Sequence, residues 1–169
     1  MVDTTMAGNL LPNAESWIAV NDGVMGGVSR STYRAQQGYA GEFSGEVSLE
    51  NNGGFASVRA PLQLGKNHVG EQLRLAVLGD GKTYSLRLRT HKSLDGIAYA
   101  ATIDTVDGEV SKHRLTPADF QPVWRGRRVS GAPSLRWQDV RQIGLMISNK
   151  QQGPFVLRLI SLDWTTDND

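Results

Sequence analysis

The sequence predicts an all-β protein, a two-sheet antiparallel β-sandwich, on three observations. Nineteen glycines stand against a hydrophobic content of 39% in 169 residues, which is typical of many turns between short strands. Turn signals recur about every 8–12 residues, the spacing found in sandwiches and barrels. Between the turns, apolar and polar residues alternate with the period of a strand, and long helical faces are absent. We therefore expect about nine or ten strands and at most two or three short helices.

The first part of the chain is predicted to hold short strands around a glycine-rich loop. That loop, residues 21–29, contains three glycines and an Asn-Asp pair, which permit unusual backbone angles. Strands are expected at 16–20, 29–34, 41–49 and 54–60. The third of these alternates, and it places on one face Phe43, Val47 and Leu49.

The turn Asn51-Asn52-Gly53-Gly54 runs directly into the strand at 54–60. Asn-Gly and Gly-Gly permit the positive φ angles that a sharp reversal requires. Within the strand, the small apolar residues Ala56, Val58 and Ala60 alternate with Phe55, Ser57 and Arg59. One face of this strand can therefore pack in a core, while the other can present groups to a partner.

The remaining strands are separated by hairpin signals and short helical turns. Gly79-Asp80-Gly81-Lys82 and Asp107-Gly108 are typical hairpin connections. Thr116 is expected to cap a helical turn that begins with Pro117, and a second such turn is expected at 137–142. Strands are expected at 72–78, 83–89, 98–105, 109–115, 142–148 and 155–164. The last is apolar on both faces, which predicts a central strand.

The length is that of one domain, and we predict a single unit over residues 14–165. Residues 1–13 and 166–169 are predicted to be flexible tails, and 123–134 to be irregular and basic. Ten side chains are expected to be largely buried: Trp17, Phe43, Val58, Leu75, Tyr84, Leu86, Leu145, Ile147, Leu157 and Leu159.

Composition and charge exclude several classes of function. Lysine plus arginine total 18 and acids total 17, a net charge of +1, which gives no global attraction to nucleic acid or anionic membrane. The absence of cysteine excludes disulfides, thiol catalysis and cysteine-ligated zinc. The N-terminus lacks the features of a signal peptide and no apolar run is long enough to insert in a membrane, so we expect a cytoplasmic protein.

No motif predicts an enzyme, a cofactor or a metal site. The sequence has no Gly-x-Ser-x-Gly elbow, and its three histidines lack metal-ligand spacing. Gly81-Lys82-Thr83 mimics the end of a P-loop, but the first glycine of that motif is missing and no helix is expected to follow. A carboxylate pair among Asp22, Asp80 and Asp95 stays open, although aspartates in loops more often close turns.

Arginines recur on the non-core sides of several predicted strands. Each is offset by one from the apolar residues of its own strand: Arg59, Arg74, Arg87, Arg89 and Arg158. We expect the first, third and fourth to share one sheet face with the other two nearby, and Glu42 and Glu46 to be the strand acids available for pairing. The cluster is either an ordinary solvated sheet face or a basic surface for a carboxylate, a phosphate or an acidic protein segment.

Several ordered motifs together make the chain resemble the complex I intermediate-associated protein family. They are Trp17 with residues 20–29, the stretch 51–59, Gly79-Asp80-Gly81-Lys82-Thr83-Tyr84, and the ending Ile143–Ser148 followed by Gly153-Pro154-Phe155. The resemblance covers roughly residues 17–164 and implies a galactose-binding-like β-sandwich of jelly-roll type, related to carbohydrate-binding modules.

The resemblance also implies a non-enzymatic role as an assembly factor or chaperone. Mitochondrial members of the family are chaperones for the respiratory NADH:ubiquinone oxidoreductase, so the implied partner is a protein client such as a respiratory-complex subunit. A module that binds a small anionic ligand or a glycan is the alternative. A pull-down and a glycan array separate the two.

The candidate partner-binding or ligand-binding residues come from the loops and from the arginines. They are Asp22, Asn52, Arg59, Arg74, Arg87, Arg89 and Arg158. For Asp22, Asn52 and Arg59 a structural role is an equal alternative to ligand contact, since loops on a rigid sandwich often carry binding groups.

Overall fold

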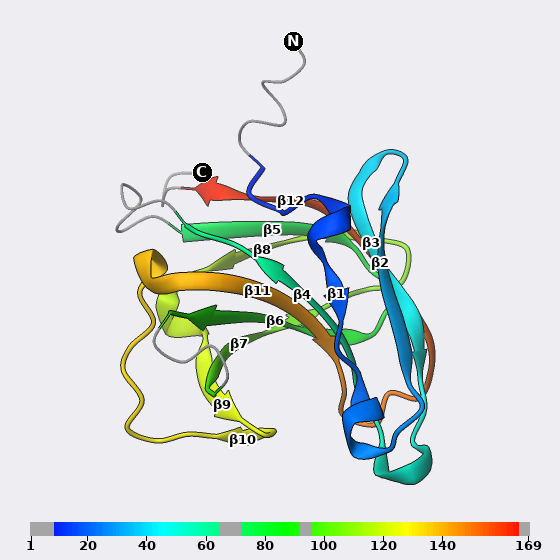
Figure 1. The fold of residues 1–169 in the computed structure, drawn as a ribbon. Coiled ribbons are helices and arrows are strands. Elements are labelled where there is room, and N and C mark those ends of the chain that lie inside the picture. The colour runs from blue at the N-terminus through cyan, green and yellow to red at the C-terminus, as the bar shows by residue number, and fades with distance from the viewer. Residues whose placement is uncertain (1–8, 65–71, 92–95, 166–169) are drawn as a thin grey trace.

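The computed structural model of the protein describes residues 9–64, 72–91 and 96–165. They form two antiparallel sheets packed face to face (Figure 1). Asp95 and most of the two predicted tails, residues 1–8 and 166–169, lie outside the described residues. Strands dominate, and the helical elements of the described ranges are short 3₁₀ turns, so the predicted all-β sandwich is confirmed.

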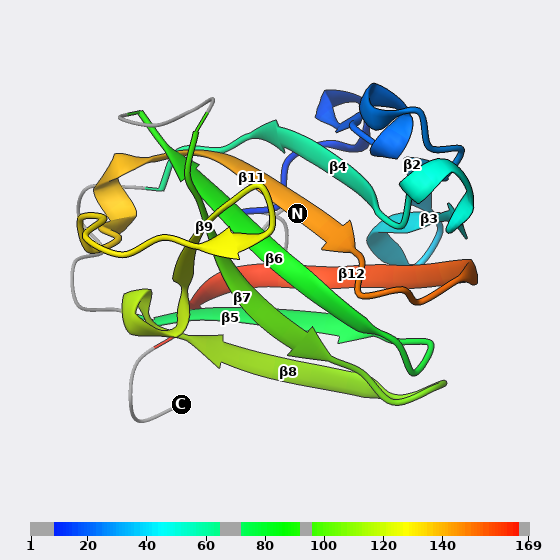
Figure 2. The same ribbon diagram turned by 90° about the horizontal axis from the view of Figure 1, so that it is seen from below.

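The first sheet has seven strands, and Figure 2 shows it from below. Its order is β1 (Ile18–Ala19), β4 (Ala56–Pro61), β11 (Val140–Ile147), β6 (Thr83–Thr90), β7 (Ala98–Asp104), β9 (Gln121–Trp124) and β10 (Arg127–Arg128). In Figure 1, β10 lies below the arching strands β6 and β7, and in Figure 2 it lies in front of β6 and β11. The β9–β10 ribbon therefore curls over the outer side of this sheet.

The second sheet has five strands in the order β2 (Arg30–Gln36), β3 (Tyr39–Val47), β12 (Gly153–Thr165), β5 (Gln72–Leu78) and β8 (Val110–Leu115). β12 pairs with β3 on one side and with β5 on the other. The prediction of a central strand from its two apolar faces is therefore confirmed.

Five 3₁₀ turns connect the strands: η1 (Ala14–Ser16), η2 (Asp22–Met25), η3 (Glu50–Asn52), η4 (Pro117–Asp119) and η5 (Trp137–Asp139). η4 confirms the predicted cap, since Asp119 Oδ2 accepts hydrogen bonds from Thr116 N at 2.7 Å and from Thr116 Oγ1 at 3.0 Å. Local sequence predicts such a turn well because cap and turn lie within four residues.

Three segments differ from the sequence prediction. β1 is shorter than the strand expected at 16–20, because the first of those residues belongs to η1. Leu49 lies beyond the end of β3 and is 36% exposed. The stretch expected to be irregular contains β9 and β10, joined by Arg125 and Gly126 at φ 51° and 78°. Two positive φ values suit a tight hairpin turn, but arginine at the first position gave no signal for one.

The core lies between the two sheets. All ten side chains predicted to be buried are at most 7% exposed, which confirms that prediction. Phe43 of β3, Tyr84 of β6 and Phe155 of β12 meet edge to face, with ring centroids 4.9–6.2 Å apart. Trp17 stacks on Tyr33 of β2 at 4.2 Å. These contacts join both sheets into one apolar cluster.

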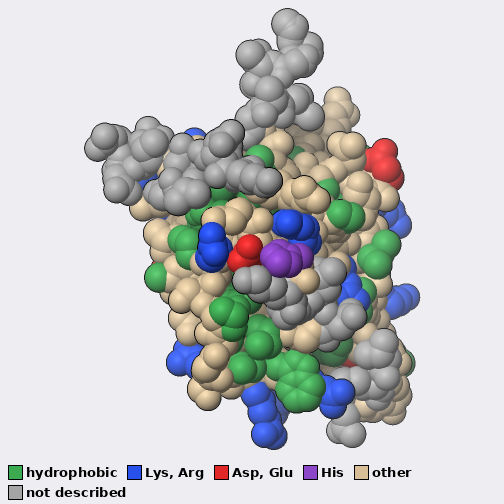
Figure 3. Space-filling view, turned by 60° about the vertical axis from the view of Figure 1, so that its left-hand side comes forward, with side chains coloured by type: hydrophobic (Ala, Val, Ile, Leu, Met, Phe, Trp, Pro, Cys, Tyr) green, Lys and Arg blue, Asp and Glu red, His purple; other side chains and the backbone are tan. Residues whose placement is uncertain are grey.

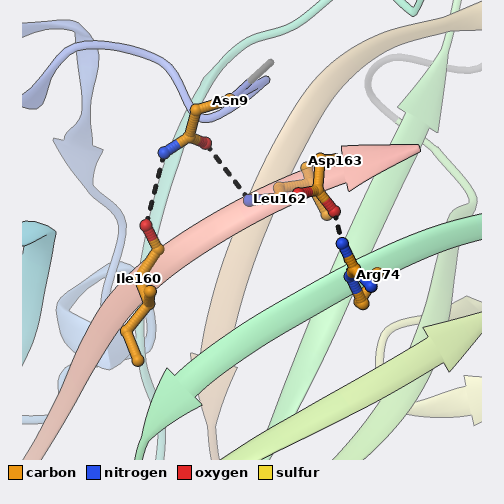
Figure 4. A network of polar contacts seen from close by, with 5 residues as sticks. All are labelled: Asn9, Arg74, Ile160, Leu162 and Asp163. Atoms are coloured by element: carbon orange, nitrogen blue, oxygen red, sulfur yellow. Dashed lines mark hydrogen bonds and ion pairs between the residues drawn. The ribbon is translucent and has the colours of Figure 1, made fainter. Parts of the chain in front are cut away.

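The N-terminal segment is attached to β12 from Asn9 onward (Figure 4). The Asn9 side chain donates to Ile160 O at 3.3 Å and accepts from Leu162 N at 3.1 Å, and Leu10 N donates to Leu162 O at 2.7 Å. Asn9 and Leu10, predicted to be part of a flexible tail, therefore contact β12 ahead of the predicted domain start.

Candidate functional site

The Asp22 carboxylate holds the glycine-rich loop to the turn before β4. Its side chain is fully buried. Oδ1 accepts from Ser29 N at 2.9 Å, and Oδ2 accepts from Ser29 Oγ at 2.6 Å, Gly54 N at 2.7 Å and Phe55 N at 3.3 Å. Two segments about 30 residues apart in the sequence are therefore held together by hydrogen bonds to one carboxylate.

These contacts determine the ionisation state of the Asp22 carboxyl group. Burial raises the pKa of the carboxyl group, but the hydrogen bonds from Ser29, Gly54 and Phe55 together bring the pKa below its usual value. Asp22 is thus an anion at neutral pH whose oxygens are occupied inside the protein. This placement argues against the ligand contact predicted from the sequence.

Two glycines allow the loops to approach this carboxylate. A Cβ atom at Gly27 would lie 2.4 Å from Asp22 Cγ, and one at Gly53 would lie 2.5 Å from Asp22 Oδ2. Either atom would overlap the carboxylate, so close approach requires glycine here. One glycine of each of these two family motifs is therefore explained by packing around Asp22.

Asn21 performs a similar role between the sheets. Its Oδ1 accepts from Ser31 Oγ of β2 at 2.7 Å and from Ser57 N of β4 at 3.0 Å. It therefore joins β2, the edge strand of the five-stranded sheet, to β4 of the seven-stranded sheet. For Asn52, the other predicted loop candidate, η3 places the backbone, and its side chain lies outside what the structure describes.

The third motif is also a structural junction. Asp80 Oδ2 accepts from Tyr84 OH at 2.9 Å and from Val156 N at 2.8 Å, and Oδ1 accepts from Lys82 N at 3.1 Å. Burial first, and then the charge and hydrogen bond of Asp80, raise the pKa of Tyr84. Asp80 thus ties the turn between β5 and β6 to β12. The hairpins predicted at 79–82 and 107–108 are wrong, because each turn crosses from one sheet to the other: β5 and β8 belong to the five-stranded sheet, and β6 and β7 to the seven-stranded sheet.

The sequence-predicted arginines meet on the outer side of the seven-stranded sheet. Arg59 of β4 and Arg87 of β6 both pair in register with Gly144 of β11, one from each side. Arg89 lies two residues beyond Arg87, on the same face, opposite Gln142. This confirms that Arg59, Arg87 and Arg89 share a face, which we call the arginine face.

The two arginines beside Gly144 have no acidic partner in the described part of the chain. Arg87 Nη1 donates to Met146 Sδ at 3.1 Å. Burial, and then the nearby charge of Arg89, lower the pKa of Arg87 to about 10, so it stays a cation at neutral pH. Arg89 differs, because its Nη1 donates to Gly96 O at 3.1 Å. Arg59 and Arg87 are therefore positive charges that the described residues do not neutralise.

The other two predicted arginines lie on the opposite side of the sandwich. Arg74 belongs to β5 and Arg158 to β12, in the five-stranded sheet, so the expectation that they lie near the arginine face is wrong. Arg74 Nε pairs with Asp163 Oδ1 at 3.3 Å (Figure 4). Arg158 Nε pairs with Glu42 Oε2 at 3.0 Å.

The acids of the five-stranded sheet therefore serve that sheet alone. Besides the Glu42 pair, Glu46 Oε1 pairs with Arg30 Nη2 at 3.1 Å. Three arginine–carboxylate pairs thus lie on this sheet, as on the ordinary solvated face that was one of the two interpretations, beside the exposed Arg34 and Arg114, which pair with no acid in the described residues. Arg59 and Arg87 differ from these because they are half-buried and still have no acidic partner in the described part of the chain.

The β9–β10 ribbon adds a feature that the sequence interpretation missed. Trp124 is 48% exposed, and Arg125 Cζ lies 4.7 Å from its ring centroid, within reach of a cation–π contact. Arg127 lies opposite Trp124 in register. Figure 3 shows hydrophobic side chains next to Lys and Arg side chains at the lower edge of the molecule. The run of arginines at 125–128 was the signal available in the sequence.

Neither a metal-binding cluster nor a membrane-spanning helix is found among the described residues. They contain no group of three His, Cys, Asp or Glu side chains placed to hold a metal ion. Their helical elements include none with the length and apolar character needed to cross a membrane.

The chain matches a protein family over most of its length. The model of the family described as complex I intermediate-associated protein 30 matches residues 9–159. None of the curated proteins compared with the chain matches it significantly.

Solved structures with the same fold are carbohydrate-binding modules and domains of agarases. A family 11 carbohydrate-binding module from Clostridium thermocellum, in complex with a β-1,3-1,4-mixed-linked tetrasaccharide, is 14% identical with a TM-score of 0.64, covering 94% of this chain and 95% of that one. A family 11 module of the cellulase Lic26A-Cel5E of the same organism has 15% identity, TM-score 0.62 and coverage of 90% and 92%. An agarase has 13% identity, TM-score 0.61 and coverage of 93% and 23%. At these identities the likeness shows the galactose-binding-like β-sandwich fold alone.

Proposed function

The chain belongs to the complex I intermediate-associated protein 30 family, and we propose that it is a non-enzymatic assembly factor that binds a protein client through the arginine face. The family name indicates the client class, an assembly intermediate of respiratory complex I. The proposed place of action is the cytoplasm, where the client exposes the surface that this protein covers.

The observation that carries the proposal is the contrast between the paired arginines of the five-stranded sheet and the two half-buried arginines beside Gly144. On the five-stranded sheet, Arg30, Arg74 and Arg158 each have a carboxylate within 3.3 Å. On the seven-stranded sheet, Arg59 and Arg87 stand in one row with Gly144 and have no such partner among the described residues. Like charges placed this close repel one another unless an anion offsets them. A client with acidic residues would supply that anion, and electrostatic complementarity would give it specificity.

A pull-down with a charge-neutralised variant tests the proposal. We expect Arg59→Gln/Arg87→Gln to reduce recovery of complex I subunits from the native cell by about tenfold or more, since truncating a buried charged contact typically has that effect. Binding by the unaltered protein should weaken with added salt. The melting temperature should stay within about 2 °C of the original, because neither arginine has an ion-pair partner in the described residues whose loss would destabilise the fold.

The matched control is Arg74→Gln/Arg158→Gln. It removes the same number of charges from the other sheet, where both arginines are already paired. This control should recover subunits as the original protein does. Equal loss in both double variants, or no subunits recovered above background with the original protein, would contradict the proposed function.

The exposed Trp124 supports a second candidate function, a carbohydrate-binding or small-ligand module. Sugar-binding sites typically present an aromatic platform, and Trp124 is 48% exposed on the β9–β10 ribbon. A glycan array and a thermal-shift screen with neutral and anionic oligosaccharides test this alternative. If the protein is such a module, it should bind at least one sugar on the array, and Trp124→Ala should abolish that binding. Binding to none of the sugars would contradict this alternative.

A further inference from the structure

Gly144 lies at the centre of the arginine face without a backbone reason for being glycine. It lies inside β11 and is paired in register with β4 and β6. Its φ angle is not among the positive ones, so its conformation is open to any residue. Glycine inside a strand weakens the strand, and it often marks a place where a ligand approaches the backbone closely.

A side chain at this position would fill the space between the two unpaired arginines. A Cβ atom built on Gly144 would lie 3.7 Å from Arg59 Cβ and 3.8 Å from Arg87 Cβ. Its nearest neighbour would be Val58 O at 3.3 Å, a contact that a small shift relieves. The site could therefore hold a small side chain, and glycine leaves the backbone of β11 uncovered between the Cβ atoms of two arginines.

The two residues on either side of Gly144 along β11 complete its surroundings. Gln142 and Met146 are two positions away, so both point to the same outer face. Met146 Sδ accepts the hydrogen bond from Arg87. The Gln142 Oε1 atom is buried and, in the part of the chain that the structure describes, receives no hydrogen bond. A buried acceptor of this kind is usually satisfied, so Gln142 is an unusual neighbour of Gly144.

We propose that Gly144 forms the base of a carboxylate-binding site, which we call the carboxylate seat. In it, Arg59 and Arg87 together bind one aspartate or glutamate side chain of the client protein. This inference rests on the proposed function and specifies its contact. Guanidinium groups match the two oxygens of a carboxylate.

Substitutions at Gly144 test the seat without the client. Gly144→Glu places a carboxylate between the two arginines, and Gly144→Gln places a neutral side chain of the same shape there. We expect the Glu variant to melt about 1–4 °C above the Gln variant at low salt, since the new pairs resemble exposed ion pairs. The difference should vanish in about 1 M NaCl because salt screens the charges. Gly144→Ala measures the effect of the Cβ atom alone. Equal melting temperatures for Glu and Gln at low salt would overturn the seat.

A titration of the original protein keeps the test independent of how these variants fold. The probe is N-acetylglutamate N-methylamide, and the signals are the arginine Nε–Hε resonances, assigned with Arg59→Lys and Arg87→Lys. We expect saturable shifts at Arg59 and Arg87, and none at Arg158, which Glu42 already occupies. Inorganic phosphate is the comparison anion.

The results separate the seat from the proposed function. No shift at Arg59 and Arg87, equal shifts at Arg158, or shifts with phosphate alone would each overturn the seat, even where complex I subunits are recovered. Saturable shifts together with a pull-down that recovers no subunits would support the seat and contradict the assembly role.

Discussion

Replacing Asp22 with alanine is expected to destabilise the protein by about 3–5 kcal/mol, one of the two largest effects that we expect. The substitution leaves Gly54 N and Ser29 N, which donate to the carboxylate at 2.7 and 2.9 Å, without their charged acceptor. Each lost hydrogen bond to a charged group is worth about 1.5–3 kcal/mol. Chemical denaturation monitored by tryptophan fluorescence measures the loss.

Asp107→Ala is the control for this prediction. Asp107 is an exposed aspartate in the β7–β8 turn, so its replacement should change stability by less than about 1 kcal/mol. A loss of similar size in both variants, or a loss below about 1 kcal/mol for Asp22→Ala, would contradict the structural role of Asp22.

Asp22 should also make stability depend on pH. Its pKa in the folded protein is lowered by the hydrogen bonds that outweigh burial, while the unfolded chain has the ordinary value near 3.9. The stabilisation is therefore fully present above about pH 4 and is lost as the pH falls through the folded-state pKa. The stability difference between the original protein and Asp22→Asn should shrink in that acidic range. A difference that stays constant down to about pH 2 would refute the linkage.

Leu157→Ala is expected to destabilise the protein by about 2–5 kcal/mol, the usual range for truncating a core leucine. Leu157 is fully buried on the central strand β12 and lies opposite Phe43 in register. The substitution removes apolar contacts and leaves a cavity between the sheets, where close packing prevents full collapse. Urea denaturation at neutral pH gives the difference in the free energy of unfolding.

The control lies one residue earlier on the same strand. Val156 points to the opposite side of β12 and is half-buried, so Val156→Ala should lose clearly less stability than Leu157→Ala. A loss below about 1 kcal/mol for Leu157→Ala, or equal losses for the two variants, would mean that the packing of β12 differs from the described one.

The sequence by itself determined which side of each strand faces the core. Alternation has a fixed period of two, so the apolar residues of a strand settle its buried face without knowledge of its neighbours. This is why Leu75, Tyr84 and Leu157 were predicted to be buried, and why Arg59 and Arg87 were predicted to point outward. The capped turn at Thr116 was predictable for a similar reason, because its contacts lie within four residues.

Only the tertiary structure decided which strands become neighbours, because pairing in a sheet joins segments far apart in the chain. Period two gives Arg74 and Arg87 the same outward direction, yet they lie on opposite sheets. The same holds for Asp22, whose acceptor role appears only when the turn at Gly54 reaches it. Gly144 became a candidate seat only once β4 and β6 were placed on its two sides, since nothing in the neighbouring sequence marks which residues will flank a glycine across a sheet.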